Sequence, residues 1–223
     1  MVKAMTATST TLAMALLCLS AVAQLARAAD GDLVAKVCAD ATSDQAGVDR
    51  FRGPGLTRES CESALRSDNR STAAKHPRDL ALVAMDLLLS ATTAADAKVN
   101  STLRSAKWGE RGTLAFQHCQ VDFEALARTV RVCHASVQEY NPSAVAGRGP
   151  DDGGNGDGLA PYYYFECMDK LRDAAGDCWK QVYYAEYVNE TGAKKMVWKE
   201  VVEATRLANL AKAMVEQMVG MFS

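Results

Sequence analysis

Residues 116–136 read FQHCQVDFEALARTVRVCHAS, a stretch with two cysteines fourteen residues apart and a histidine beside each one. The cysteines are Cys119 and Cys133, and the histidines are His118 and His134. Thiols and imidazoles in such an arrangement are compatible with a metal site, with a nucleophile and its base, or with structural disulfides. Which of these applies largely determines what the protein does.

The histidines do not have the spacing of a metal site. His118 and His134 are sixteen residues apart, about 24 Å along one helix, and the third histidine, His76, directly precedes Pro77. No HExxH, CxxC or CxxH spacing is present, and no GxSxG motif marks a nucleophile. We therefore expect no metal, no cofactor and no catalytic residue. A hydrolase built from carboxylates that meet only in the fold stays open as an alternative.

The N-terminus has the pattern of a secretory signal peptide. The apolar run from Thr11 to Ala23 is shorter than the roughly 20 residues of a membrane span. It is followed by Ala26 and Ala28, small residues of the kind found at signal-peptidase sites. We predict that residues 1–29 are a signal peptide; the alternative is a short N-terminal anchor.

Cleavage of this peptide would leave an even number of cysteines. Cys18 is removed and six cysteines remain of the seven in the sequence; in an oxidising compartment this number favours disulfides. Removal of Lys3 and Arg27 leaves 23 basic against 27 acidic residues, a net charge of −4. Because no basic cluster stands out, we expect neither a nucleic-acid partner nor a membrane partner after cleavage.

Three N-glycosylation sequons are consistent with a secreted glycoprotein. They begin at Asn69, Asn100 and Asn189.

Four long helices are expected from residue 77 onward. The clearest is the last, whose apolar residues repeat with spacings of four and three: Val197, Val201, Ala204, Ala208, Ala211, Val215, Met218 and Phe222. The other three cover about 77–106, 113–140 and 162–188. For the helix that starts at Pro77, Asn100 is expected on the face opposite the buried one. The residues expected on that buried face are Leu80, Ala84, Leu87, Ala91, Ala94 and Ala95.

Two connections have turn and loop composition. Gly192, before the last helix, can adopt the left-handed conformation that ends a helix. Residues 141–161 are rich in Gly, Pro and Asp and read as a flexible insertion. The DDGGNGDG segment within it lacks a calcium-loop pattern, because counting from Asp151 the third position is Gly153 and the twelfth is Tyr162.

A shorter unit at residues 30–70 precedes these helices. Asp32–Ala41 and Thr57–Arg66 read as two short helices, and each carries one cysteine, Cys38 or Cys61. A bond between these cysteines would clasp a hairpin that has little apolar surface of its own. The predicted fold is all-α: an antiparallel up-down four-helix bundle at 77–222, preceded by a disulfide-clasped helical hairpin.

The cysteines of the quoted stretch can pair with two cysteines of the following helix. Cys167 and Cys178 are eleven residues apart, so each pair of cysteines lies on one face of its helix. If the helices are antiparallel, joining Cys119 to Cys178 brings Cys133 toward Cys167. The two cysteines of the first helix are about 21 Å apart along its axis and those of the second about 16.5 Å, a difference of less than one helical turn. The geometry favours this pairing; the alternative is that Cys133 and Cys167 are free buried thiols.

Several segments together resemble the plant invertase and pectin methylesterase inhibitor family, over essentially the whole mature chain. They are LRSDNRS at 65–71, DLALVAMD at 79–86, Trp108 leading into LAFQHCQVDF at 114–123, and a fourth cysteine followed by a closing amphipathic helix. The resemblance implies that residues 30–223 form a secreted, non-enzymatic inhibitor of the plant cell wall (apoplast). It also implies a stoichiometric complex with a carbohydrate-active target enzyme, and bonds from Cys38 to Cys61 and from Cys119 to Cys178. Cys133 and Cys167 are additional to the family pattern.

The choice of target depends on the start of the helix near residue 162. Invertase inhibitors of this family carry Pro-Lys-Phe there, whereas this chain has Pro161, Tyr162 and Tyr163. These three are candidate target-binding residues, and the missing lysine makes pectin methylesterase the slightly preferred target over invertase. The alternative is a secreted helical bundle that binds a ligand or acts as a signal without an enzyme target.

Overall fold

The computed structural model describes residues 32–43, 54–105, 110–141, 161–184 and 192–220. All regular secondary structure in these ranges is helical, so the fold is all-α, as predicted. The predicted signal peptide, nearly all of the Gly- and Asp-rich insertion, and Asn189 lie outside the described residues.

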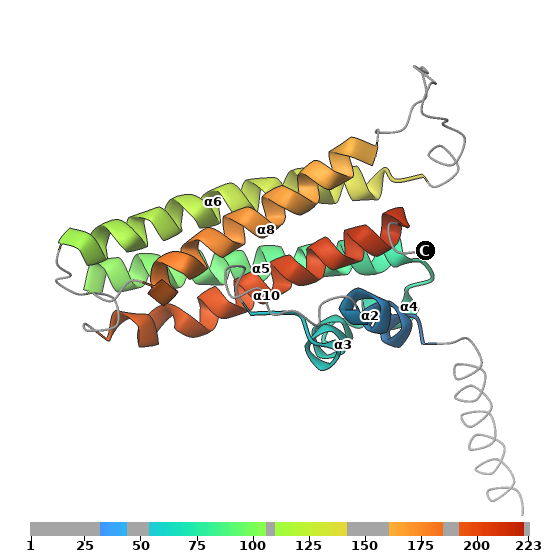
Figure 1. Ribbon diagram of the computed structural model, residues 1–223, viewed down its shortest axis with the longest axis horizontal. Coiled ribbons are helices and arrows are strands. Elements are labelled where there is room, and N and C mark those ends of the chain that lie inside the picture. Colours follow the sequence, from blue (N-terminus) through green and yellow to red (C-terminus); the bar gives the residue numbers. More distant parts are fainter. Residues whose placement is uncertain (1–31, 44–53, 106–109, 142–160, 185–191, 221–223) are drawn as a thin grey trace, which may run out of the picture.

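Four long helices account for most of the described chain. They are α5 (Pro77–Ser105), α6 (Glu110–Gln138), α8 (Pro161–Tyr184) and α10 (Ala193–Val219). Figure 1 shows them side by side, each running back along the one before it. Helix α5 packs against α6 and α10, and α8 packs against the same two helices, so the four close into a ring around a shared core.

Helix α10 contributes a continuous buried face. The predicted apolar positions from Val197 to Met218 are all buried, which confirms the spacing argument, and Phe222 lies outside the described residues. The helix starts four residues earlier than its first predicted apolar position, directly after Gly192. As predicted, Gly192 adopts the left-handed conformation, with φ of 71°, where other residues are strained.

The buried face predicted for α5 is wrong in part. Leu80, Ala84 and Ala95 are buried, but Ala94 is exposed and Leu87 and Ala91 are only half-buried. The core side passes instead through residues spaced mostly by four, namely Leu80, Ala84, Leu88, Thr92, Ala95 and Val99. Alanine occurs on every side of this helix and so marks no face, and packing against both α6 and α10 decides which residues are covered.

Helix α5 is also long and apolar enough to cross a membrane by length and composition alone. Its most apolar window has a mean hydropathy of 1.5, and 44% of that window is buried inside the protein. A core helix of a soluble protein passes the same test.

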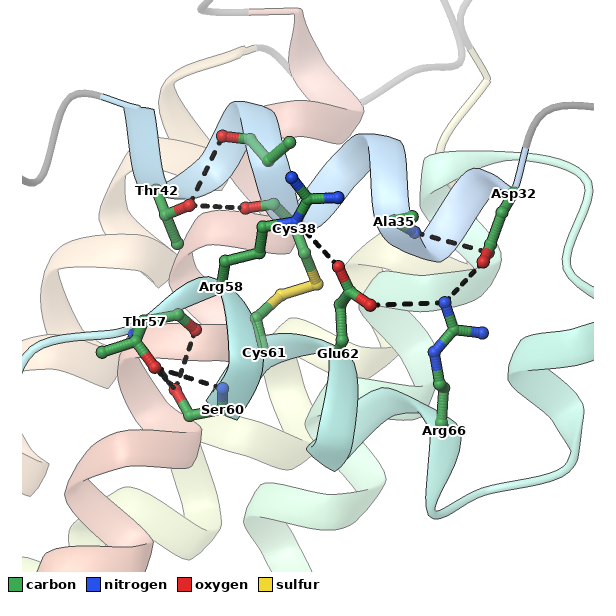
Figure 2. Close-up of a disulfide and its surroundings, with 11 residues drawn as sticks. Asp32, Ala35, Cys38, Thr42, Thr57, Arg58, Ser60, Cys61, Glu62 and Arg66 are labelled. Carbon is green, nitrogen blue, oxygen red and sulfur yellow. Dashed lines mark hydrogen bonds and ion pairs between the residues drawn. A yellow bond between two sulfur atoms is a disulfide. The ribbon is translucent and has the colours of Figure 1, made fainter.

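Two short helices, α2 (Leu33–Ser43) and α3 (Arg58–Arg66), lie beside the long ones. Figure 2 shows the Cys38–Cys61 disulfide between them, with Cα atoms 5.7 Å apart. The side chain of Thr57 accepts a hydrogen bond from the backbone amide of Ser60, and the Ser60 hydroxyl accepts one from the amide of Thr57. This capping box fixes where α3 begins.

Ion pairs add to the contact between α2 and α3. The Arg66 guanidinium binds Asp32, the residue just before α2, and lies 3.4 Å from Glu62, which also accepts a bond of 2.8 Å from Arg58 (Figure 2). Hydrogen bonding by Arg66 lowers the pKa of Asp32. These side chains are largely exposed, so they orient the two helices more than they stabilise them.

The α2–α3 unit is seated on α5 and α10. Val34 and Val37 of α2 and Leu65 of α3 are buried in the common core. The side-chain amide of Asn209 on α10 donates to the carbonyl oxygen of Pro54 at 3.1 Å. The four-residue helix α4 (Arg70–Ala73) follows, and Arg70 forms a 2.7 Å ion pair with Asp86 of α5.

Replacing Cys38 and Cys61 together by Ser is expected to lower the free energy of unfolding by about 2–4 kcal/mol, because the unfolded chain regains the freedom of a closed loop. Most helical circular dichroism should survive at low temperature, since the four long helices keep their core. Thermal unfolding followed at 222 nm measures the loss, with Ser63→Ala on the exposed side of α3 as the control. An unchanged midpoint would show that packing alone holds this unit.

Candidate functional site: the disulfide-joined pair of helices α6 and α8

Two disulfides join α6 to α8. Cys119 is bonded to Cys178 and Cys133 to Cys167, with Cα separations of 4.5 and 5.7 Å. The structure joins the cysteines in the pairs that the helical geometry favoured, and all four are buried. Because there are two bonds along one helix contact, α6 and α8 can neither slide nor rotate freely relative to each other.

The histidines of the quoted stretch take no part in a shared site. His118 is exposed on α6, whereas Nε2 of His134 lies 3.4 Å from a carboxylate oxygen of Asp86 on α5. Within the described ranges, no group of three or more His, Cys, Asp or Glu side chains could hold a metal ion. The chemistry of FQHCQVDFEALARTVRVCHAS is therefore that of its disulfides.

The candidate target-binding residues open α8. The helix begins at Pro161, a favoured residue for the first helical position, and Tyr162 follows. The side chain of Tyr163 is 52% exposed. These residues lie at the end of α8 nearer the Cys133–Cys167 bond.

One tyrosine at the start of α8 belongs to the core. Tyr164 is buried, its ring meets that of Tyr140 edge to face at 5.4 Å, and its hydroxyl lies 3.4 Å from the carbonyl oxygen of Ser136. Burial raises the pKa of both tyrosines. Tyr164 thus anchors the start of α8 on the end of α6, while Tyr163 and Phe165 on either side are exposed.

Exposed large apolar side chains concentrate on the disulfide-joined helices. In the described part of the chain all but Met196 belong to α6 or α8: Leu114, Val121, Val132, Tyr163, Phe165, Tyr183 and Tyr184. Exposed apolar residues mark a protein interaction surface where they form a contiguous patch, so their arrangement around each helix is what matters.

The three on α6 form a row. Leu114, Val121 and Val132 are separated by seven and eleven residues, so they lie within about 20° of one another around the helix. Around the helix axis, Asp122 lies about 60° from buried Cys119, on the side toward α8. The row lies about 150° from Cys119 in the same direction. It therefore faces outward on the α8 side of α6. Val121 and Val132 are 62% and 66% exposed.

A carboxylate beside the Cys119–Cys178 bond has a shifted pKa. Burial, together with the negative charge of Asp177 on α8, raises the pKa of Asp122 to about 6, and His118 partly opposes this. Asp177 is itself bound by the Lys180 ammonium at 3.0 Å. The junction of α6 and α8 therefore changes its charge in the mildly acidic range.

The sequons within the described chain lie away from this helix pair. Asn69 is exposed just before α4, and Asn100 is half-buried on α5. Asn100 is less exposed than we predicted when we placed it on the face of α5 opposite the buried one.

A helix pair fixed by two disulfides can hold its exposed side chains in one arrangement for contact with another protein. The family described as plant invertase/pectin methylesterase inhibitor matches residues 32–214, most of the chain, so the chain belongs to that family. Its members are protein inhibitors and generally secreted, and three disulfides fit an extracellular protein. No curated protein and no solved structure matches the chain.

The outward row on α6 was not identified from the sequence, although a signal for it existed. Val121 stands between Gln120 and Asp122, and Val132 follows Arg131, on a helix whose core positions are already filled by Phe123, Val130 and others. Apolar residues left over once the core stripe has been assigned are the signal that could have revealed this surface.

Replacing Asp122 by Asn is expected to change the pH dependence of stability. A carboxyl group whose pKa is raised from 3.8 to about 6 binds its proton more tightly in the folded state, so wild-type stability should fall as pH rises from 4 through 6. Asp122→Asn should remove this contribution and raise stability at pH 7 by on the order of 1 kcal/mol, after allowance for partial exposure. Thermal unfolding at pH 4 and 7 measures it, with exposed Asp173→Asn as the control. Parallel pH profiles for wild type and Asp122→Asn would contradict the expectation.

Proposed function

We propose that the protein is a secreted inhibitor that docks on pectin methylesterase and blocks it in a stoichiometric complex in the plant cell wall. Residues 1–29 act as the signal peptide, and residues 30–223 form the inhibitor domain: an antiparallel up-down bundle preceded by the clasped hairpin. The observation that carries the proposal is the concentration of exposed apolar side chains on the disulfide-joined helices α6 and α8. Inhibition is then steric and requires no catalytic residue.

The physical support is preorganisation. Helices held by two disulfides lose little conformational freedom when they bind, which lowers the entropic cost of association. Burial of exposed Val121 and Val132 against a partner contributes about 1–2 kcal/mol for each side chain. We name the outward residues Leu114, Val121, Val132 and Tyr163 the docking surface.

Pectin methylesterase is preferred over invertase because of the start of α8. Tyr162 stands where the invertase inhibitors carry lysine, so the cation expected of that class is missing. In the next turns of α8 the carboxylates are balanced by cations of the same helix: Glu166, Asp169, Asp173 and Asp177 each lie 3.0 Å from a Lys or Arg side chain.

Titration of the purified protein into pectin methylesterase at mildly acidic pH should abolish activity at a stoichiometric end point. The same titration into invertase should have a weaker effect, since the lysine is absent. Residual activity of both enzymes at several-fold molar excess would sink the proposal, and a stoichiometric end point with invertase alone would reverse the preference.

Replacing Val132 or Val121 by Glu is expected to weaken inhibition by about 10- to 100-fold, because a charge then enters a desolvated contact. Stability should change little, since both residues are exposed. The matched control is Met196→Glu, which places the same charge at an exposed apolar position on α10, outside the docking surface. If Met196→Glu weakens inhibition as much as Val132→Glu does, the docking surface has been assigned to the wrong face.

A further inference from the structure

A polar groove of about 320 Å³ runs between α5 and α6, on the side of α6 away from α8. Its floor includes Thr92 of α5 and Phe123 of α6, both about 1% exposed. The volume is at the lower end of the range seen for small-molecule sites. Around α6, Arg128 lies only about 20° from Val121 and about 40° from Val132, so the basic end of this groove borders the docking surface.

Four charged side chains line the groove. Asp96 of α5 and Glu124 of α6 supply carboxylates, and Arg128 and Arg131 of α6 supply guanidinium groups. Among the described residues, none of the four has an ion pair within 4 Å. Glu124 and Arg128 are four residues apart, a spacing that allows an ion pair within one helix. They do not form this pair, so both charges are available to a ligand.

The charges are segregated along the groove. Glu124 precedes Arg128 and Arg131 by about 6 and 10.5 Å along the helix. Glu124 also helps raise the pKa of Asp96, after burial, which places the two carboxylates near each other. The groove thus has an acidic end and a basic end.

The floor of the groove holds a polar atom without a partner. The hydroxyl of Thr92 is buried and makes no hydrogen bond in the structure. A buried hydroxyl without a hydrogen-bond partner costs about 1–3 kcal/mol. Such a group needs an explanation, for example a functional role or a bound water molecule. Because this oxygen is fully buried, it is not a direct contact for a ligand in the groove.

We propose that this groove binds a sugar acid, a uronate unit, through its carboxylate and its ring hydroxyls. The guanidinium groups of Arg128 and Arg131 pair with the carboxylate, as two parallel charge-assisted hydrogen bonds favour. The hydroxyls donate to Asp96 and Glu124.

Other ligand classes match the groove less well. A simple anion would leave the carboxylates of Asp96 and Glu124 without a donor, a neutral sugar would leave both guanidinium groups unpaired, and a basic ligand would be repelled by the arginines. The assignment does not rest on the inhibitor function, because it makes no use of the target enzyme.

The test is a titration of the purified protein with trigalacturonate, followed by amide NMR shifts and calorimetry. We expect shifts centred on residues 92–96 and 123–131, and affinity at least 10-fold lower for the fully methyl-esterified trisaccharide, which keeps the rings and removes the charges. Arg128→Gln and Arg131→Gln should each weaken binding about 10-fold. Asp96→Asn should weaken it less, because an amide can still accept a hydrogen bond from a hydroxyl.

The control variant is Arg104→Gln, which removes an exposed arginine of α5 outside the groove. Equal affinity for the charged and esterified trisaccharides, or equal weakening by Arg104→Gln, would overturn the proposal. So would free glutamate binding as tightly as trigalacturonate, since it carries a carboxylate without a sugar ring. Failure of these titrations alongside intact enzyme inhibition would remove the groove assignment and leave the inhibitor function in place.

Discussion

The pair of disulfides between α6 and α8 is the constraint on which the rest of the molecule depends. The four cysteines are fourteen residues apart on one helix and eleven on the other. A single bond would fix one point of contact and leave the helices free to pivot about it. Two bonds also fix the axial register and the crossing, and therefore decide which side of each helix faces outward. The orientation of Val121, Val132 and Tyr163 toward solvent follows from these two bonds.

The remaining helices cover the apolar sides of α6 and α8 that face the core. Helix α10 covers the inner side of α8 with an almost unbroken apolar face, and α5 covers α6 in the same way. The α2–α3 unit is too small to have a core of its own, so it combines one disulfide with the burial of a few residues such as Val37 and Leu65 against α5 and α10. Stiffness is therefore greatest where partner binding is proposed.

The parts of this fold that could be predicted are those specified by local spacing. The four-and-three repeat of α10 marks one face without ambiguity, and the cysteine spacings restrict the pairing of α6 with α8. In α5, apolar residues such as Ala94 occur on every side, so only the packing of neighbouring helices selects the buried face. The groove depends on Asp96 and Arg131, which are thirty-five residues apart, and on how closely α5 approaches α6. Periodicity carries no information about that approach.

The Cys133–Cys167 bond has a topological consequence for the Gly- and Asp-rich insertion. With the backbone from residue 133 to residue 167, the bond closes a covalent ring that contains the whole insertion. A proteolytic nick inside that ring would produce two polypeptides that remain one covalent molecule, with α6 and α8 still in register. Changes in the length of the insertion would likewise leave the ring closed at the same two sulfur atoms. The sequence of this segment is therefore not needed to keep α6 and α8 covalently joined.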